Sequence, residues 1–559
     1  MRKILFIIIS FSVLFLAGGV LAVDSDQVFF VDQNYDANGS QSVRATLVKT
    51  TPNLYFYFEK NWWEAQSDYD KNEILSKLNG LSDEFAGKIY PTLTSALGSE
   101  WRPGIDGNNK ITVLFHDIKI SATGYFRSAD EYSRLQVPSS NQMEMVYLSV
   151  AQITSPHLKE FLAHEFAHLI VFNQKERNHA VPEEIWLNEA IADYSSTLLG
   201  YNDIYQDSNL QRRVEDFLQR PDDSLTEWQN TKYDYAVVNL FIHYLVDHYG
   251  VGILRDSLKS DRVGIEGLNQ ALLQNGAKEN FAQIFTNWTI AILVNNCSIN
   301  PKYCYITPNL ANLRINPALI FLPVSGNSSL SITNFTKNWS GNWQKIVGGS
   351  GSLKLQFSSS ANRNFQIPYL VFDKDNNYSI KFLPLDKNKI GQITIEDFSN
   401  KYNLLIIIPS LQSKMSGFNG LEIGYPFDIE ISTADKNQQD EGLLVQELLA
   451  KIDYLKKQIA MLQEGSVFLS QCSNLSVNLY YGILNASQVR CLQQFLASQG
   501  TEIYPEGFVT GNFGILTKSA VIRFQKKYAS DVLNPIGLFD GTGFVGNLTR
   551  QKINQILNS

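Results

Sequence analysis

Histidine and cysteine are scarce in this sequence, and its excess of charge is small. Among 559 residues there are seven His and four Cys. So few cysteines exclude a small fold held together by many disulfides, and none lie at the Cys-x-x-Cys spacing of a structural zinc site. The formal net charge of −8 argues against a nucleic-acid partner, because binding to phosphates needs a basic surface.

Long apolar runs are missing after the N-terminus. The run at that end, Ile4–Leu16, follows Arg2 and Lys3 and precedes Ala22, a small residue that suits a cleavage site. This order predicts a signal peptide over residues 1–22, and an uncleaved N-terminal anchor is the alternative. No later stretch approaches about 18 apolar residues, so we expect a mature chain that is exported and not embedded in a membrane.

The four cysteines fit such an export route. Cys297 and Cys304 are close together in the sequence, and so are Cys472 and Cys491. Two local disulfides are therefore the simplest of the three connectivities that four cysteines allow.

The most informative feature that is present is His164-Glu165-Phe166-Ala167-His168. On a helix, residues four apart lie on the same face, so the two imidazoles can converge on one metal ion. Glu165, about 100° further round the helix axis, then lies beside a metal-bound water. The stretch predicts a metal centre on a helix.

A second predicted helix, residues 182–199, offers a third metal ligand. Catalytic zinc usually takes three protein ligands and keeps one position for water. Glu189 would be that ligand, since its apolar neighbours leave only a narrow polar stripe on the helix. Asp193, four residues later on the same face, would accept a hydrogen bond from the far nitrogen of a ligating His. A solvated helix face is the alternative for both carboxylates.

Four segments give the chain a resemblance to a known family: Ile111–Phe115, Gly124–Phe126, His164–Asn173 and Trp186–Ala190. Over roughly residues 26–304 they resemble the gluzincin zinc metallopeptidases, and most closely the hyicolysin-like neutral metallopeptidases. The resemblance implies an α+β zincin-like fold that holds one zinc ion (Zn2+) per chain.

The resemblance also implies how the zinc is held and used. His164, His168 and Glu189 would bind the metal, and Asp193 would lie behind a ligand. Glu165 would take a proton from the attacking water and pass it to the leaving amine. We expect a protein or peptide substrate that is cut internally, because no sequence signature for binding a free N-terminus is visible.

Many gluzincins add a Tyr or His that donates a hydrogen bond to the developing oxyanion. Tyr233 best matches the position of that Tyr in the aminopeptidase-type members, and His243 and His248 are alternatives. A Tyr that only anchors the start of a helix is an equally good interpretation of Tyr233.

Two further predictions concern the approach to the metal centre. The residues Met143–Ser149 read as a strand just before the active-site helix, and the resemblance implies an edge strand that pairs with the substrate. Asp106–Asn109 reads as a turn that feeds the strand Ile111–Phe115. Its acidic and amide groups could also hold calcium, but a simple turn is the favoured interpretation.

The chain is too long for one core, and its composition changes along its length. We predict a metallopeptidase domain over residues 23–305 and a β-sandwich accessory domain over residues 306–436. In the second domain, short runs that alternate apolar with polar residues are separated by clusters of turn residues. Trp339 and Trp343 in the second domain suit a sandwich core better than a carbohydrate site.

The C-terminal part of the chain has two features of its own. Apolar residues at heptad spacing within 441–464 predict a short coiled coil or helical spacer over residues 437–466, which allows weak self-association. Residues 467–559 contain a sequence repeat: the pattern Gly-x-x-Gly-x-Leu-Thr-Lys/Arg occurs at Gly511–Lys518 and again at Gly543–Arg550. This part resembles the small α-helical peptidoglycan-binding domain of cell-wall hydrolases, which implies the bacterial cell wall as a partner.

Three functions are consistent with these features. The first is a secreted, cell-wall-associated zinc metalloendopeptidase with Glu165 as general base. The second is a peptidoglycan peptidase that cuts wall cross-links. The third is a noncatalytic wall-binding or adhesion protein with a degenerate peptidase fold, and the presence of Glu165 with both ligand motifs argues against it.

Overall fold

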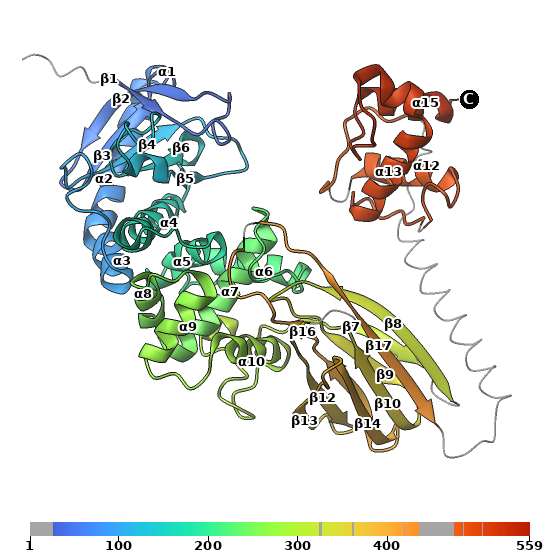
Figure 1. Cartoon of the computed structure of the whole chain (residues 1–559). Helices are drawn as coiled ribbons and strands as arrows, with labels where there is room; N and C mark the ends of the chain where they lie inside the picture. The colour runs from blue at the N-terminus through green and yellow to red at the C-terminus, as the bar shows by residue number, and fades with distance from the viewer. Residues whose placement is uncertain are drawn as a thin grey trace, which may run out of the picture. The chain divides into compact units, whose positions relative to one another are not determined.

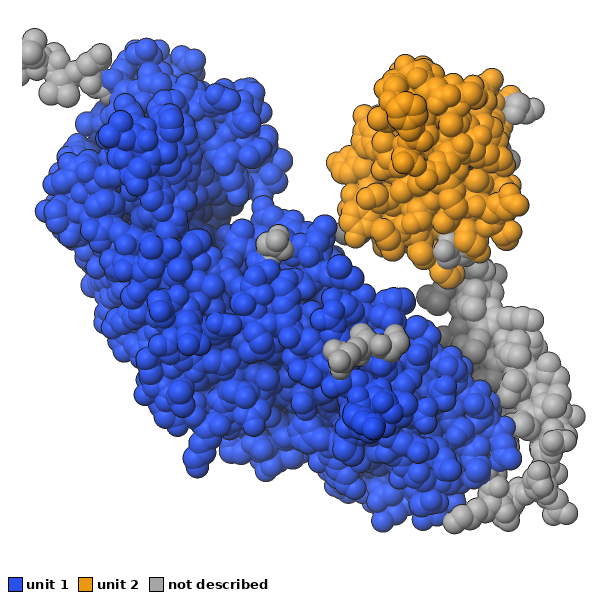
Figure 2. Space-filling view, viewed as in Figure 1, with its two compact units in different colours: residues 1–444 blue, residues 445–559 orange. Residues whose placement is uncertain are grey.

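The computed structural model describes residues 26–323, 327–359, 363–418, 420–434, 474–483, 486–505 and 507–558. The predicted signal peptide and the predicted spacer over residues 437–466 lie outside the described residues. The chain divides into two compact units, residues 1–444 and 445–559, which Figure 2 shows in blue and orange. It is a multidomain chain with both helices and sheets, as predicted.

The first unit begins with a six-stranded mixed sheet in the order β1-β2-β3-β4-β6-β5 (Figure 1). β3, β4 and β6 run parallel, and β5 pairs antiparallel with β6 at one edge. β4 and β6 are buried along their whole length, as expected for strands covered on both faces. The strands are β1 (Asp26–Phe30), β2 (Ser42–Thr50), β3 (Leu54–Glu59), β4 (Ile111–His116), β5 (Gly124–Phe126) and β6 (Met145–Ser149).

Helices cover one face of this sheet. Phe56 and Phe115 of the strands share an apolar core with Leu78, Leu93 and Phe166 of three helices, which fixes the helix that carries His164 and His168 against the sheet. The helical elements of this part are α1 (Lys60–Glu64), α2 (Asp68–Glu84), η1 (Phe85–Ile89), α3 (Tyr90–Leu97), η2 (Ser128–Glu131), η3 (Val150–Gln152), α4 (Leu158–Val171) and η4 (Phe172–Arg177).

A bundle of helices follows and extends the same core. Its elements are α5 (Ile185–Leu198), α6 (Asn209–Gln219), α7 (Lys232–Tyr249), α8 (Gly252–Leu258), α9 (Gly264–Gln274), α10 (Phe281–Val294) and the short η5 (Pro308–Leu310). Among the described residues no single helix is long and apolar enough to cross a membrane; α7 and α8 meet that criterion only as a pair, bent by 108°.

The rest of the first unit is a β domain around its own apolar core. Its strands form two sets, β13-β12-β15-β9-β7 and β14-β10-β17-β8, which a single residue pair, Phe398 with Tyr402, links into a nine-stranded sheet; β11 and β16 pair separately. Side chains of both sets share the one core, which is compatible with the predicted sandwich. Alternating burial marks the strands in the sequence but does not determine their partners. The strands are β7 (Ala318–Leu322), β8 (Ser328–Thr336), β9 (Gln344–Gly348), β10 (Gly351–Ser358), β11 (Phe365–Gln366), β12 (Pro368–Asp373), β13 (Tyr378–Phe382), β14 (Ile390–Phe398), β15 (Tyr402–Ile407), β16 (Ser410–Leu411) and β17 (Tyr425–Ala434).

The β domain and the helical bundle share part of one core. Trp339 and Trp343 are both buried, and both belong to the core of the helices and not to that of the β domain. The Trp339 ring packs edge-on against Phe281 and Phe285 of α10, and the Trp343 indole donates a hydrogen bond to the Thr289 carbonyl. These tryptophans are core residues, and neither is available to a carbohydrate.

The first predicted disulfide is confirmed. Cys297 and Cys304 are joined, with their Cα atoms 5.1 Å apart. Cys491 is also disulfide-bonded, whereas Cys472, its predicted partner, lies outside the described residues.

The second unit is a small helical domain with its own core. Its described helices are α12 (Ser487–Ser498), α13 (Ile515–Lys527), α14 (Ala529–Val532), η6 (Asn534–Ile536) and α15 (Asn547–Leu557). The sequence repeat reappears as two buried glutamines, Gln493 and Gln525, each of which ties its helix to the glycine-rich loop that follows it. The hydrogen bonds of both side chains reach residues 17, 18, 19 and 24 positions later.

Candidate metal centre

Helix α4 buries one face and leaves two imidazoles on the other. Leu162, Phe166 and Leu169 are buried in the core beside the sheet. His164 and His168, one turn apart, point away from that core toward α5. The sequence pattern therefore predicted both the helix and the side of it that carries chemistry.

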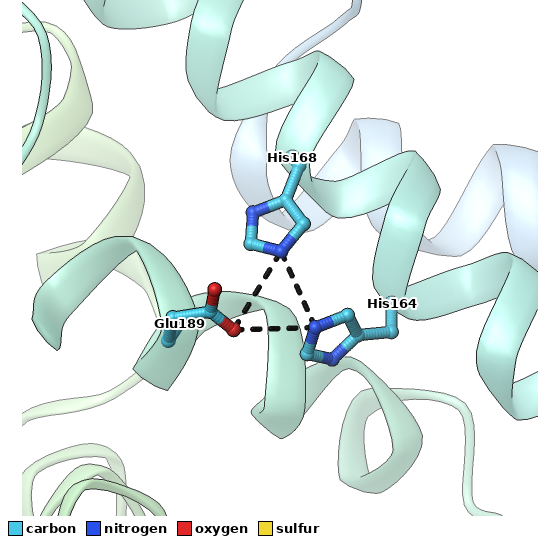
Figure 3. A group of neighbouring side chains, drawn as sticks. All are labelled: His164, His168 and Glu189. Atoms are coloured by element: carbon cyan, nitrogen blue, oxygen red, sulfur yellow. Dashed lines mark hydrogen bonds and ion pairs between the residues drawn. The ribbon is translucent and has the colours of Figure 1, made fainter. Parts of the chain in front are cut away.

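The predicted ligands come together in space. His164 Nε2 and His168 Nε2 lie 3.2 Å apart, and Glu189 Oε2 lies 3.3 Å from the first and 3.7 Å from the second (Figure 3). The ligand atoms of a tetrahedral zinc, at bonds of about 2.0–2.1 Å, are roughly 3.3 Å from one another. The triangle is therefore the size that one such ion needs.

The unmet hydrogen-bonding capacity of these atoms also fits a cation. Glu189 Oε2 is buried and has no hydrogen-bond partner. Two imidazole nitrogens and a carboxylate oxygen that face one another present lone pairs to a common point, and nitrogen with oxygen is a donor set that zinc accepts. Among the described residues, this is the group of His, Cys, Asp or Glu side chains that converges closely enough to hold a metal.

Nearby carboxylates favour the protonated form of His164. Burial disfavours the charged form of His164, but the carboxylate of Glu189, 3.3 Å away, and the charge of Glu165 outweigh that effect and raise the pKa of His164 to about 9. A proton therefore occupies this site at neutral pH when no cation does, and binding of a metal must release it.

The residue behind His168 is Asn188, which the sequence did not predict. The Asn188 side-chain oxygen lies 2.8 Å from His168 Nδ1. An amide oxygen can only accept, so the proton of the neutral imidazole stays on Nδ1 and the lone pair of Nε2 faces the metal position. The only signal in the sequence was its place beside Glu189, the next ligand.

Asp193 does not have the predicted place behind a ligand. Its two carboxylate oxygens accept hydrogen bonds from Arg213 (2.7 and 2.9 Å), Asn209 (3.0 Å) and Asn239 (2.7 Å), and none from a histidine. Burial opposes its charge, but Arg213 more than compensates and lowers the pKa of Asp193 to about 2. The spacing placed Asp193 on the correct face, but one turn further along α5 that face meets α6 and α7.

Glu165 lies at the border between α4 and the sheet edge. It is buried, and a Cβ on Gly124 of β5 would lie 3.1 Å from its Oε1 and only 2.6 Å from the Tyr147 carbonyl oxygen, so glycine suits this close approach of the strand. Burial and the charge of Glu189 raise the pKa of Glu165 to about 8, although His164 lowers it. A carboxylate with a raised pKa is a competent proton acceptor near neutral pH.

The strand that borders the centre is β5, and the prediction that Met143–Ser149 forms the edge is wrong. β6, which covers most of that segment, lies between β4 and β5. β5 is Gly124–Phe126, one of the four segments that carry the resemblance, but three residues are too few for an alternating pattern to predict a strand. The free edge of the sheet therefore begins at Gly124.

Of the two tyrosines near the start of α7, Tyr235 is the one whose phenol responds to the charges of the centre, and its hydroxyl donates a hydrogen bond of 3.2 Å to the Asn230 side-chain oxygen. Burial and the charges of Glu189 and Glu165 raise its pKa, and Arg213 stacks on its ring at 4.7 Å. Tyr233, the predicted residue, lies under Lys232 and Arg220 instead. Two residues are about 200° apart on a helix, so only one of the two tyrosines can face the metal position.

The two alternative histidines lie elsewhere. His243 is buried between Thr197 and the Asn239 carbonyl, at 2.8 Å from each. His248 lies 2.9 Å from the Cys304 carbonyl. A second tyrosine, Tyr35, was missed by the sequence analysis; it stacks on Tyr125, and the charges of Glu189 and Glu165 contribute to the rise in its pKa after burial.

Comparisons with known proteins give few and weak matches. No protein-family model matches the sequence, and no curated protein is similar to it. A mitogen from Yersinia pseudotuberculosis aligns with 20% of this chain and 92% of its own, at 13% identity and a TM-score of 0.15. PliG from Aeromonas hydrophila, a periplasmic inhibitor of g-type lysozyme, aligns with 21% of this chain and 98% of its own, at 14% identity and a TM-score of 0.14. TM-scores this low support no conclusion about fold or function.

Proposed function

We propose that the chain is a zinc metalloendopeptidase of the gluzincin type, similar to the hyicolysin-like enzymes. The observation that carries the proposal is the triangle formed by the Nε2 atoms of His164 and His168 and by Glu189 Oε2. A mixed sheet whose antiparallel edge strand borders the HExxH helix is consistent with a zincin-like domain. Zinc bound there would lower the pKa of a water molecule and polarise the carbonyl of the scissile bond.

The residues around the triangle then have separate tasks. Asn188 holds His168 in the tautomer that binds a metal. Glu165 accepts the proton of the attacking water and delivers it to the leaving amine. The Tyr235 hydroxyl would turn from Asn230, to which it now donates, and donate its hydrogen bond to the developing oxyanion. The free edge of β5 would pair with the main chain of an extended substrate.

We also propose an exported, extracytoplasmic site of action at a bacterial cell wall. The basis is the N-terminal sequence together with the resemblance of residues 467–559 to peptidoglycan-binding domains. The same resemblance favours a second candidate substrate, the peptide cross-links of peptidoglycan itself. Both substrates are cut by the same chemistry at the same centre.

The test is Glu165→Gln in the full chain. We expect the variant to keep one zinc per chain, measured by metal analysis, and to lose hydrolysis by about 10²–10⁴-fold, because the amide cannot take up the proton. Digestion of a mixture of unfolded proteins, and in parallel of isolated cell-wall sacculi, identifies the substrate.

The matched control is Glu160→Gln on the same helix, where the carboxylate pairs with His157 at 2.8 Å and not with the metal ligands. This variant should retain activity. Full turnover by Glu165→Gln, or a mature protein that takes up no zinc, contradicts the proposed function.

A further inference from the structure

Three tyrosine rings form a stack at the edge of the sheet beside the candidate metal centre. Tyr125 of β5 and Tyr147 of β6 are paired residues of neighbouring strands, and their rings stack with centroids 4.3 Å apart and planes at 8°. The ring of Tyr35, from the segment between β1 and β2, stacks on Tyr125 at 4.6 Å and 15°. Since Tyr147 already covers one face of the Tyr125 ring, Tyr35 lies on the other face, beyond the edge strand.

The Tyr35 ring takes the place of a side chain from a further strand. Tyr125 and Tyr147 belong to the apolar core on the face of the sheet away from α4, whereas the next residue, Phe126, stacks on His168 of α4. Neighbouring strands lie about 4.7–4.9 Å apart, and directly opposed residues carry their side chains on the same face. β5 ends the strand order, so a ring 4.6 Å beyond that of Tyr125 lies where the next strand would place its side chain.

The segment that carries Tyr35 is bound to the loop between β4 and β5. The Tyr35 carbonyl accepts a hydrogen bond of 2.8 Å from the Lys119 N–H, and Ala37 donates its N–H to the Asp117 carbonyl at 3.0 Å. These two bonds flank the ring on the chain and hold it in the stack. The Tyr35 side chain is only half-buried, so part of it remains open to whatever lies along the edge of the sheet.

The ladder of β5 determines which residue of a paired strand would meet this ring. The Ser149 N–H donates to the Thr123 carbonyl, so in the alternating ladder of an antiparallel pair Tyr125 is the next residue bonded to β6. The backbone groups of Gly124 and Phe126 therefore point to the free edge. An antiparallel strand that bonds to them has one residue opposite Tyr125, in a pair of the type whose Cα atoms are only about 4.5 Å apart. The side chain of that residue points to the place filled by the third ring of the stack.

We propose that Tyr35 is a specificity-determining residue, which restricts the substrate position opposite Tyr125 to glycine or alanine. The inference rests on the proposed function, in which an extended substrate pairs with the free edge of β5. A longer side chain at that position would overlap the Tyr35 ring, and forcing extra atoms into a filled space displaces its neighbours. Burial, and after it the charges of Glu189 and Glu165, raise the pKa of Tyr35, so its phenol lies within electrostatic reach of the candidate metal centre.

The restricted position lies close to the bond that would be cut. A Cβ on Gly124 would lie 3.1 Å from Glu165 Oε1, so the proposed general base marks the start of β5 as the place of the scissile bond. Tyr125 is the next residue of the strand, and we therefore expect the restricted position within two residues of that bond. Its neighbours on both sides carry their side chains toward α4, so Tyr35 restricts one position and leaves theirs unaffected.

The experiment maps, by mass spectrometry, where the full zinc-loaded chain cuts a mixture of peptides of random sequence. We expect one position within two residues of the cut bond at which Gly and Ala are preferred over Leu and Phe by about tenfold or more, as for side chains that a packed site does not admit. Tyr35→Ala should accept Leu at that position as well as Ala, with unchanged preferences elsewhere. A wild-type map in which no such position appears overturns the inference without any variant.

Two further variants separate the ring from other roles of the segment. Tyr35→Phe keeps the ring without its hydroxyl and should keep the wild-type preference. Asn34→Ala, which changes an exposed side chain next to Tyr35, is the matched control and should also cut like the wild type. An equal loss of turnover on every peptide in Tyr35→Ala shows a structural role alone and overturns the inference, as does an unchanged preference in that variant. If the wild type cuts no peptide at all, the proposed function fails first and the inference fails with it.

Discussion

Single atoms around the candidate metal centre decide what its ligands can do. The amide oxygen of Asn188 fixes which nitrogen of His168 carries the proton. Arg213 donates hydrogen bonds to Asp193, which therefore does not contact the metal-ligand histidines. Both effects depend on partners from other helices. They could not be read from the spacing of ligands along one helix.

The two neighbouring tyrosines provide a test at this scale. We expect Tyr235→Phe to lower kcat by about 10²–10³-fold, the usual cost of losing one oxyanion donor, with little change in KM. Tyr233→Phe is the matched control, because its ring lies under Lys232 and Arg220 and does not face the centre. Steady-state kinetics of both variants on one peptide make the comparison. A loss of kcat in Tyr233→Phe that equals the loss in Tyr235→Phe would return the role to the predicted residue.

At the scale of elements, a short buried segment joins the helices to the β domain. Ser224 donates a hydrogen bond to the Asn338 carbonyl, and Leu225 donates its N–H to the Trp339 carbonyl. Beside them Asp223 is buried, with one carboxylate oxygen unpartnered and Arg220 3.3 Å from the other. Burial, only partly offset by Arg220, raises the pKa of Asp223 to about 7.

This raised pKa predicts a dependence of stability on pH. Between about pH 4 and pH 7 the folded chain keeps a proton that the unfolded chain releases, so Asp223 makes the protein less stable as the pH rises. We expect Asp223→Asn to exceed the wild type in stability by about 1–3 kcal/mol near pH 8 and to equal it near pH 4. Urea unfolding at both pH values measures the difference. Asp222→Asn, an exposed neighbour, should show no such dependence on pH.

The sequence determined some elements well and others poorly, for identifiable reasons. Helix α4 and the ligand triangle were predictable, because apolar residues at helical spacing and ligands at fixed intervals report on one face of one helix. β5 escaped prediction because three residues carry no periodicity, and the pairing of the nine-stranded sheet escaped because alternation gives faces and not neighbours. Trp339 was expected in a core, but in that of the β domain and not in that of the helices.

At the scale of the whole molecule, the candidate metal centre and the small helical domain belong to different compact units. Catalysis and attachment to a wall, if both functions hold, are therefore carried by separate parts of the chain. A division of this kind predicts that one part can be removed without destroying the other.

Truncation after residue 444 tests this division. We expect residues 23–444 to keep the wild-type kcat/KM on a soluble peptide but to stay in the supernatant when isolated sacculi are pelleted. The full chain with Glu165→Gln serves as the binding control, since it should pellet with the sacculi without cutting them. Pelleting of the truncated chain to the same extent as the full chain would contradict a wall-binding role for the second unit.

The two buried glutamines of the second unit also indicate how its two halves are related. The same hydrogen-bonding plan at the same offsets is what a segment copied in tandem leaves behind. The copies now differ at an exposed loop position, Asn512 in the first and Phe544 in the second, where the ring of Phe544 stacks on Tyr480. The two copies thus share their internal hydrogen bonds and differ in their outer loops, so the two halves of the unit present different surfaces.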